Sequence, residues 1–314
     1  MEPKIEDVSI RIRHRKTDVE NIVFTTFNTL IMITLCVVML YPMLNTLAIS
    51  FNDGLDTVRG GVYLWPRIFT LQNYRVVLKM DTIYDAFVIS VLKMIITVVT
   101  NLFFTSMLAY TISRKEYVLR KPITTIFVLT MYFNAGLIPN YLLIKSLGMI
   151  NTFAAYWVPN IISAFNLIVL RTYIKTIPES FVESARIDGA KEFRIFFQII
   201  LPLCVPTMAT IALFVAVGSW NSWFDTLIYN SGKQYLSTLQ YELQKLLASA
   251  MNAGNRTPAA TGADAAAAAG GKNTTTPQGI RAAITIVTAV PILVVYPFLQ
   301  RYFVTGLAIG GVKE

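Results

Sequence analysis

The sequence predicts an all-helical protein that crosses a membrane several times, because its composition is apolar and its uncharged segments are long. Of the 314 residues, 54% are hydrophobic and 14% are charged, whereas soluble domains carry about 25% charged residues. The mean hydropathy is +0.55. Several segments contain roughly 20 or more apolar residues, the length that an α-helix needs to cross a bilayer. We therefore expect a polytopic membrane protein rather than a soluble domain with a large core.

Six helical spans account for these apolar segments. The stretch 122–170 has Lys145 as its only charged residue and is too long for a single crossing. We place a tight reversal at "KSLGMINT", because Gly148 and Asn151 are typical turn residues. The predicted spans are residues 22–50, 86–112, 123–144, 153–170, 205–228 and 282–300.

The distribution of positive charge predicts the orientation of the spans. One set of connecting segments holds sixteen Lys and Arg in 79 residues, and the opposite set holds ten in 96 residues. Cytoplasmic loops carry the excess of Lys and Arg, so we expect both termini in the cytoplasm. The predicted organisation is a cytoplasmic tail (1–21), a six-span domain (22–306) with a cytoplasmic loop (176–202) and an extracytoplasmic loop (229–281), and a cytoplasmic tail (307–314).

Several classes of function are disfavoured by the composition. The net charge of +9 is spread in short basic clusters between apolar spans, which fits membrane orientation and not nucleic-acid binding. Cys36 and Cys204 lie in apolar runs, and His14, in a basic tail, is the only histidine. We therefore expect no disulfide framework, no metal site and no Ser-His-Asp catalytic set. A membrane-embedded enzyme, which would need a convergent catalytic set, is the weaker alternative.

The segment "FVESARIDGAKEFRIFFQIILPL" predicts a short helix-turn-helix. Thr176 and Glu179 have the spacing of a capping box, and a helix is expected over 178–187. Gly189 then permits a positive φ that ends the helix. A second short helix is expected over 191–200.

At this segment the sequence resembles a known family. "ESARIDGAKEFRIFFQIILPL" looks like the "EAA" loop of ABC-importer permeases, although Ser184 stands where the family usually has Ala. "QRYFVTGLAIGGVKE" is similar to the ending of the second membrane subunit of maltose-type importers, with Glu314 where a final Gly is common. "GLIPNYLLIKSLGMINT" and "GSWNSWFDTLIY" resemble the subgroup that handles larger oligosaccharides.

The resemblance implies the permease subunit of a binding-protein-dependent ABC importer for oligosaccharides, with a type I permease fold, in a bacterial plasma membrane. It implies as partners a second homologous permease, two cytosolic ATPase subunits and an extracytoplasmic sugar-binding protein. ATP and Mg²⁺ would be bound by the ATPase and no cofactor by this chain, which contains no "GxxxxGK[ST]" sequence. The rival is an ion-coupled secondary transporter, but such folds usually place ionisable residues in mid-membrane, and Lys93 alone qualifies.

The resemblance also implies a coupling role for the turn, in which ATP-driven closure of the ATPase dimer would move the spans by alternating access. Glu183 would pair with a basic residue of the ATPase, Asp188 would shape the turn, and small residues would allow close approach. The implied coupling residues are Glu183, Ser184, Ala185, Asp188, Gly189 and Ala190. The implied contacts of the tail with the ATPase are Gly310, Gly311, Val312 and Lys313. The alternatives are a helix resting on lipid headgroups and a frayed C-terminus.

Polar and aromatic residues near the outer ends of the spans are candidates for the substrate path. Sugars stack their C–H faces on aromatic rings and pair their hydroxyls with polar groups. The candidates are Trp220, Asn221, Trp223 and Asp225 in the fifth span, Lys93 in the second and Asn134 in the third. Alternatives are an aromatic belt for the tryptophans, a snorkelling side chain for Lys93 and helix–helix packing for Asn134. The composition of segment 254–279, which is rich in Ala, Gly and Thr, does not assign it a role.

Overall fold

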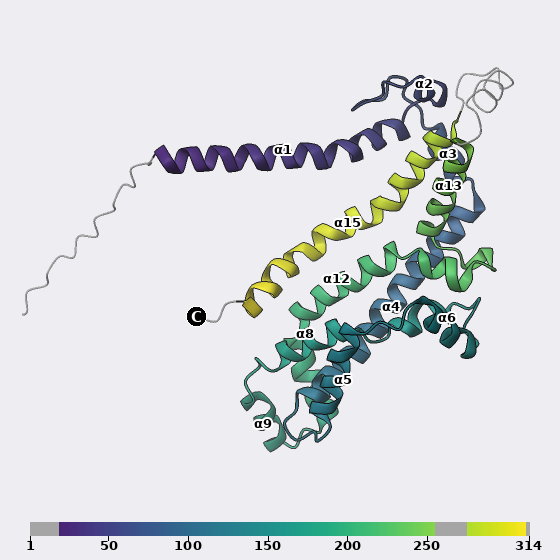
Figure 1. Ribbon diagram of the computed structural model, residues 1–314. Coiled ribbons are helices and arrows are strands. Elements are labelled where there is room, and N and C mark those ends of the chain that lie inside the picture. Colours follow the sequence, from purple (N-terminus) through teal and green to yellow (C-terminus); the bar gives the residue numbers. More distant parts are fainter. Residues whose placement is uncertain (1–18, 255–274, 312–314) are drawn as a thin grey trace, which may run out of the picture.

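The protein is a bundle of long, oblique helices joined by short helices at its two ends (Figure 1). The computed structural model describes residues 19–254 and 275–311, where regular structure is helical apart from one bridge between Asn52 and Phe69. The helices of the first half are α1 (Val19–Ser50), α2 (Gly54–Val58), α3 (Gln72–Leu78), α4 (Asp81–Ser113), α5 (Arg120–Tyr132), α6 (Leu137–Ser146), α7 (Ala154–Trp157), η1 (Val158–Asn160) and α8 (Ala164–Ile174). Those of the second half are α9 (Ser180–Ile187), α10 (Glu192–Ile195), η2 (Phe196–Ile200), α11 (Leu201–Leu203), α12 (Val205–Asn221), η3 (Thr226–Asn230), η4 (Gln234–Leu236), α13 (Leu239–Gly254) and α15 (Pro277–Gly311).

Three helices in the described ranges are each long and apolar enough to cross a membrane alone: α1, α4 and the first half of α15. Two further spans are possible as bent pairs, one of α7–η1 with α8 at 45° and one of α10–α11 with α12 at 77°. The all-helical membrane fold is therefore confirmed. The count of six spans stays a prediction.

The predicted third span is not one continuous helix. Helix α5 ends at Tyr132 and α6 begins at Leu137, and Gly136 between them has a φ of 86°. The side chain of Asn134 accepts a hydrogen bond from the Gly136 amide at 2.9 Å. Pro139 follows in the first turn of α6, where its ring is tolerated but would clash with a preceding helical turn. These residues end one helix and begin another within an otherwise apolar run.

The fifth span is shorter than predicted, and the sixth begins earlier. Helix α12 ends at Asn221 instead of continuing to residue 228, because Ser222 is extended, with a φ of −77° and a ψ of 104°. Helix α15 begins at Pro277 rather than at residue 282. A turn forms at the predicted "KSLGMINT" segment, since Gly148 and Asn151 both have a positive φ; that it separates two membrane spans stays a prediction.

Two apolar clusters hold opposite ends of the bundle together. The first packs α4, α8 and α9 against η2 and α12. The second packs α3, α4 and α12 against α13 and α15, and it buries Leu239 and Leu243 of α13. A buried aliphatic side chain contributes about 1.5–3 kcal/mol, so both ends of α4 are firmly anchored.

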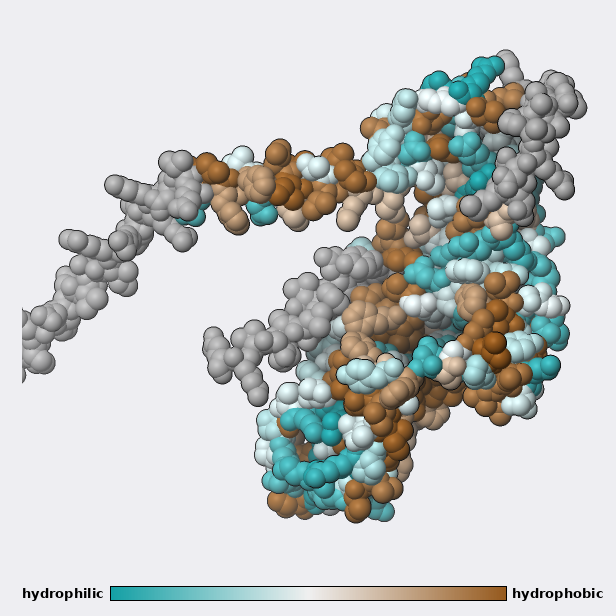
Figure 2. All heavy atoms as spheres, viewed as in Figure 1, coloured by the Kyte–Doolittle hydropathy of each residue, from teal (hydrophilic) through white to brown (hydrophobic). Residues whose placement is uncertain are grey.

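Helix α1 stands away from most of the bundle (Figure 1). Its side chains from residue 21 to residue 44 are all exposed within this chain, and hydrophobic side chains dominate its visible face (Figure 2). Such a surface requires lipid or another apolar helix around it. The helix therefore fits a membrane-spanning element and not a soluble one.

Candidate functional site

A polar cavity of about 900 Å³ lies between α4, the α5–α6 break, η1, α8 and α12. Of the predicted path residues, Lys93, Asn134 and Asp225 line it. Its other polar lining residues carry uncharged amides or hydroxyls. They are Thr97, Asn101, Thr130, Asn160, Ser163, Asn166, Ser219, Ser222 and Tyr229. Amides and hydroxyls both donate and accept hydrogen bonds, so the cavity suits a ligand rich in hydroxyl groups.

Lys93 does not snorkel towards the membrane surface, because its ammonium is held inside the protein. Its Nζ atom donates to the Asp225 carboxylate and to the Ser222 carbonyl, both at 2.9 Å. It also lies 4.8 Å from the centre of the Tyr156 ring, the distance of a cation–π contact. The Lys93 side chain is only 2% exposed. Of the two readings of Lys93, the structure therefore selects the one that faces the cavity.

Three of the predicted path residues do not line this cavity. Trp220 is 3% exposed, donates from Nε1 to the Thr288 carbonyl at 3.1 Å, and packs within the second apolar cluster. Asn221 donates to the Val217 carbonyl and accepts from Gln240. Neither it nor Trp223 is among the lining residues. The end of α12 and the residue after it instead contribute Gly218, Ser219 and Ser222 to the lining, and a path role for Trp220, Asn221 and Trp223 stays a prediction.

Sequence reasoning missed most of the cavity's polar lining, although one signal was available. Thr97 and Asn101 follow Lys93 at intervals of four residues, which places all three on one helical face. Asn101 donates to the Asn160 carbonyl at 2.8 Å, joining α4 to η1. Such polar residues at helical spacing inside an apolar span indicate a face that avoids lipid.

The predicted helix-turn-helix forms at the end of the bundle opposite α13 (Figure 1). Gly189 has a φ of 77°, its amide donates to the Arg186 carbonyl at 3.0 Å, and the Ala190 amide donates to the Ala185 carbonyl at 2.9 Å. These two bonds make a Schellman motif, which requires a left-handed residue at the glycine position. The break at residues 188–189 is confirmed.

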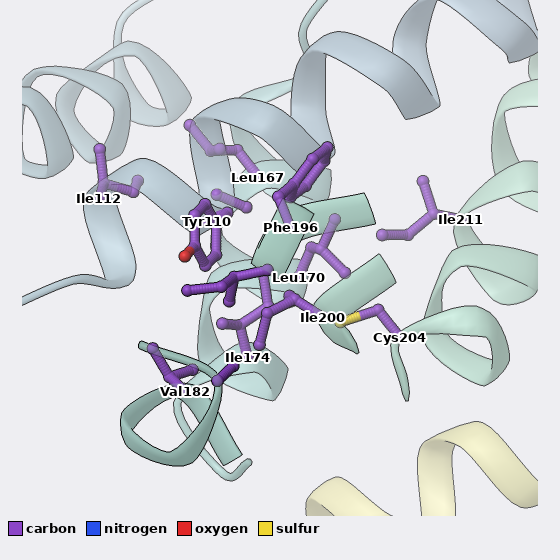
Figure 3. Packing of buried hydrophobic residues seen from close by; sticks show 13 residues of the cluster. Tyr110, Ile112, Leu167, Leu170, Ile174, Val182, Phe196, Ile200, Cys204 and Ile211 are labelled. Atoms are coloured by element: carbon purple, nitrogen blue, oxygen red, sulfur yellow. The ribbon is translucent and has the colours of Figure 1, made fainter. Parts of the chain in front are cut away.

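Helix α9 has one buried and one exposed face. Val182 and Ala185 belong to the first apolar cluster, and Val182 lies beside Ile174 (Figure 3). Ala185 therefore supports α9 from within the chain and does not lie on an open surface, contrary to the close approach expected of it. The side chains of Glu183, Ser184 and Asp188 are exposed, as is Gly189.

The predicted capping box does not form. The Thr176 hydroxyl donates back to the Tyr173 carbonyl at 2.7 Å, and Glu179 instead pairs with Lys115 at 2.5 Å. Glu179 is itself the residue before α9, with no side-chain cap bond. The long-range ion pair thus replaces the local cap.

A charged network ties this turn to α4. Arg186 donates to Glu116 at 2.8 Å and to one oxygen of Glu192 at 2.9 Å, and the other Glu192 oxygen accepts from the Tyr110 hydroxyl at 2.6 Å. The hydrogen bond from Arg186 lowers the pKa of Glu116, and the two glutamates raise the pKa of Arg186. Exposed ion pairs are individually weak. The Tyr110–Glu192 bond is partly buried, so we assign it the larger share.

Helix α4 belongs to both regions. Lys93, at the cavity, and Tyr110, at the turn, are seventeen residues apart on it, or about 26 Å at 1.5 Å per residue. The continuous helix α4 therefore connects the cavity lining to the region of the Gly189 turn.

The predicted ATPase contacts in the C-terminal tail fall at the end of the described residues. Gly310 and Gly311 end α15, whereas Val312 and Lys313 lie outside the described residues. Most of the segment 254–279 lies outside them too, apart from Gly254 at the end of α13 and residues 275–279, of which Pro277 begins α15.

Comparison with known proteins agrees with this arrangement. The family described as "Binding-protein-dependent transport system inner membrane component" matches residues 21–309. The polygalacturonan/rhamnogalacturonan transport system permease protein YtcP of Bacillus subtilis (strain 168) is 35% identical over 274 residues, which cover 87% of this chain and 92% of that protein. The arabinooligosaccharides transport system permease protein AraQ of Halalkalibacterium halodurans is 30% identical over 278 residues, covering 87% and 91%.

A solved structure has the same fold. It is the crystal structure of a bacterial ABC transporter involved in the import of the acidic polysaccharide alginate, in which one chain superposes with a TM-score of 0.81 and 27% identity. The match covers 91% of this chain and 98% of that one. With the family match over residues 21–309, this chain belongs to the family of binding-protein-dependent transport system inner membrane components.

Proposed function

We propose that this chain forms one side of the passage of an ABC importer for oligosaccharides. The observation that carries the proposal is the cavity, whose lining combines amides and hydroxyls with the rings of Phe214, Phe224 and Tyr229. Rings that stack on sugar C–H faces and polar groups that pair with hydroxyls are what a sugar needs. The names of the relatives, which refer to polygalacturonan, rhamnogalacturonan and arabinooligosaccharides, support the same class of substrate.

The Gly189 turn is proposed to receive a cytosolic ATPase, which would bind ATP and Mg²⁺. Beside the exposed Glu183, Ser184 and Asp188, the turn carries apolar side chains that this chain leaves uncovered: Ile187 is 86% exposed and Phe193 is 70% exposed. Exposed apolar side chains within a polar rim mark protein interaction sites. This proposal places the turn and both termini in the cytoplasm, in agreement with the charge distribution.

The complete importer would contain a second homologous permease, two ATPase subunits and an extracytoplasmic sugar-binding protein. The uncovered apolar surface of α1 supports a neighbouring membrane helix or lipid. Residues 310–313 are proposed to reach the ATPase dimer. Deleting residues 310–314 should then lower uptake, and unchanged uptake would support a frayed end.

Uptake by the purified importer tests the proposal. The importer is copurified with its native partners, reconstituted in proteoliposomes, and supplied with its sugar-binding protein and a labelled oligosaccharide. We expect uptake that requires internal ATP and that stimulates ATP hydrolysis. Uptake driven by an ion gradient without ATP would support a secondary transporter instead. Mass spectrometry of the glycan that copurifies with the binding protein would identify the sugar.

A further inference from the structure

The cavity carries one pair of opposite charges. Within the part of the lining that the structure describes, Lys93 and Asp225 are the only charged residues. They come from α4 and from the segment that follows α12, and their ion pair measures 2.9 Å. This side of the cavity therefore has no net charge.

The two members of the pair differ in their access to the cavity. Two of the three hydrogens of the Lys93 ammonium have acceptors, the Asp225 carboxylate and the Ser222 carbonyl. The Tyr156 ring centre lies 4.8 Å from Nζ, and the Lys93 side chain is 2% exposed. The Asp225 side chain is 17% exposed. One of its oxygens accepts from Lys93 and the other from the Ser222 hydroxyl. Each carboxylate oxygen can accept a second hydrogen bond, so the more exposed carboxylate has acceptor capacity left, whereas the buried ammonium already binds two acceptors.

Two hydroxyls close to this pair in the fold have no partner. Thr97 lies one helical turn from Lys93 on α4 and is 3% exposed, and Ser219 lies on α12 one turn before Ser222. Both line the cavity, and neither hydroxyl oxygen has a hydrogen-bond partner among the described residues. A buried hydroxyl without a partner is costly. Such groups in a cavity wall indicate a ligand that supplies the missing bonds.

We propose that Asp225, together with the Thr97 and Ser219 hydroxyls, binds uncharged hydroxyl groups of the transported sugar, and that Lys93 is a positioning residue for Asp225. This inference rests on the proposed function and specifies the chemistry that this side of the passage recognises. The carboxylate accepts bonds from sugar hydroxyls, and the two protein hydroxyls donate or accept as needed. A carboxylate on the sugar finds no free cation on this side of the cavity, so Lys93 does not select acidic sugars.

Two double variants separate the role of Asp225 in binding from its role in charge balance. K93M/D225N and K93M/D225L both remove the ion pair without leaving an unpaired charge. They differ in whether position 225 can form hydrogen bonds. We expect K93M/D225N to keep most of the uptake in the reconstituted importer and K93M/D225L to lose about tenfold, the effect of one hydrogen bond. The control is Lys145→Met, which changes an exposed lysine outside the cavity lining.

A third variant leaves the ion pair intact. Thr97→Val removes a hydroxyl that has no hydrogen-bond partner among the described residues. The thermal stability of the importer should therefore not fall, while uptake should drop about tenfold. Thr105→Val is the matched control, because Thr105 is also a buried, unpartnered threonine on α4 but does not line the cavity. It should not change uptake.

Uptake is measured with galactopentaose and with pentagalacturonic acid, each delivered by the sugar-binding protein. The proposal expects the same fold-loss for every sugar that the wild type carries. Equal uptake by the two double variants would overturn it, as would a loss in K93M/D225N confined to the uronate, which would make Lys93 a carboxylate reader. Failure of the wild type to take up either sugar or the copurified glycan would instead contradict the proposed function itself.

Discussion

The Tyr110 hydroxyl on α4 donates to the Glu192 carboxylate on α10 at 2.6 Å. This bond joins the helix that lines the cavity to the segment that follows the Gly189 turn. Arg186 binds the other oxygen of the same carboxylate, so α4, α9 and α10 meet at one residue. The turn is therefore connected to α4 through Glu192 as well as through apolar packing.

Removing the Tyr110 hydroxyl should loosen this connection. In Tyr110→Phe, we expect faster amide hydrogen exchange over residues 186–196 and less sugar taken up per ATP hydrolysed, because a hydrogen bond to a charged group contributes about 1.5–3 kcal/mol. Tyr84→Phe, at an exposed tyrosine near the other end of α4, is the control. Wild-type exchange and coupling in Tyr110→Phe would show that apolar packing alone carries the motion.

Substitution of Gly189 separates backbone strain from contact with a partner. Gly189 has a φ of 77° and nothing within 4 Å of the position of an added Cβ. Among the described residues, a valine here would therefore meet no steric clash, and its cost would come from the left-handed backbone conformation. We expect Gly189→Val to abolish uptake and the coupling of ATP hydrolysis while the protein stays in the membrane. Gly189→Asn should retain more of both activities, because Asn tolerates the left-handed region. Gly148→Val imposes the same backbone strain away from the Gly189 turn and should retain coupling. Equal uptake by Gly189→Val, Gly189→Asn and Gly148→Val would contradict a coupling role for the Gly189 turn.

Reversing the charge of Glu183 should disrupt an interaction with another chain. Glu183 is exposed and belongs to no ion pair within the described residues. Glu183→Lys should therefore leave the membrane-inserted amount unchanged but reduce binding of the ATPase, measured by copurification. Asp85→Lys, an exposed reversal on α4, should have no such effect. Normal ATPase recovery with Glu183→Lys would argue against the pairing.

The buried ion pair should show strong non-additivity in thermal unfolding. Leaving one buried charge unpaired costs about 3–5 kcal/mol, whereas replacing both charges is often neutral. We expect Lys93→Met and Asp225→Asn each to lower the unfolding temperature of the purified importer, and the double variant to recover most of the loss. Additive losses would show that the two side chains act independently.

The sequence predicted the elements that depend on local patterns. The long apolar helices α1 and α4 and the turn at Gly189 follow from residue type alone. A long apolar run favours a membrane-spanning helix, and a glycine after a short helix favours a left-handed end, with no tertiary contact needed to decide either. The break at residues 133–136 also had local signals in Asn134, Gly136 and Pro139. These signals are weak against the apolar residues on either side, which favour a single continuous span.

The candidate site was only partly predictable, because its contacts are remote in sequence. Lys93 and Asp225 are 132 residues apart, and no local pattern pairs them. Trp220 and Lys93 are both residues that can lie at an interface, but tertiary packing buries the tryptophan against α15 and turns the lysine towards the cavity. Glu179 likewise forms an ion pair with Lys115 instead of the predicted capping hydrogen bond. Tertiary contacts outweighed local preference in each case.

The turn after α9 is proposed to contact the ATPase and to pass its motion to α4. Placing a photoreactive amino acid at Ile187, which is 86% exposed, tests this most directly in intact cells. The same group at Trp65, which is 83% exposed in the segment between α2 and α3, is the control. We predict that light joins position 187, but not position 65, to an ATPase subunit identified by mass spectrometry. Adducts of position 187 with lipid alone, or with the extracytoplasmic binding protein, would contradict the account.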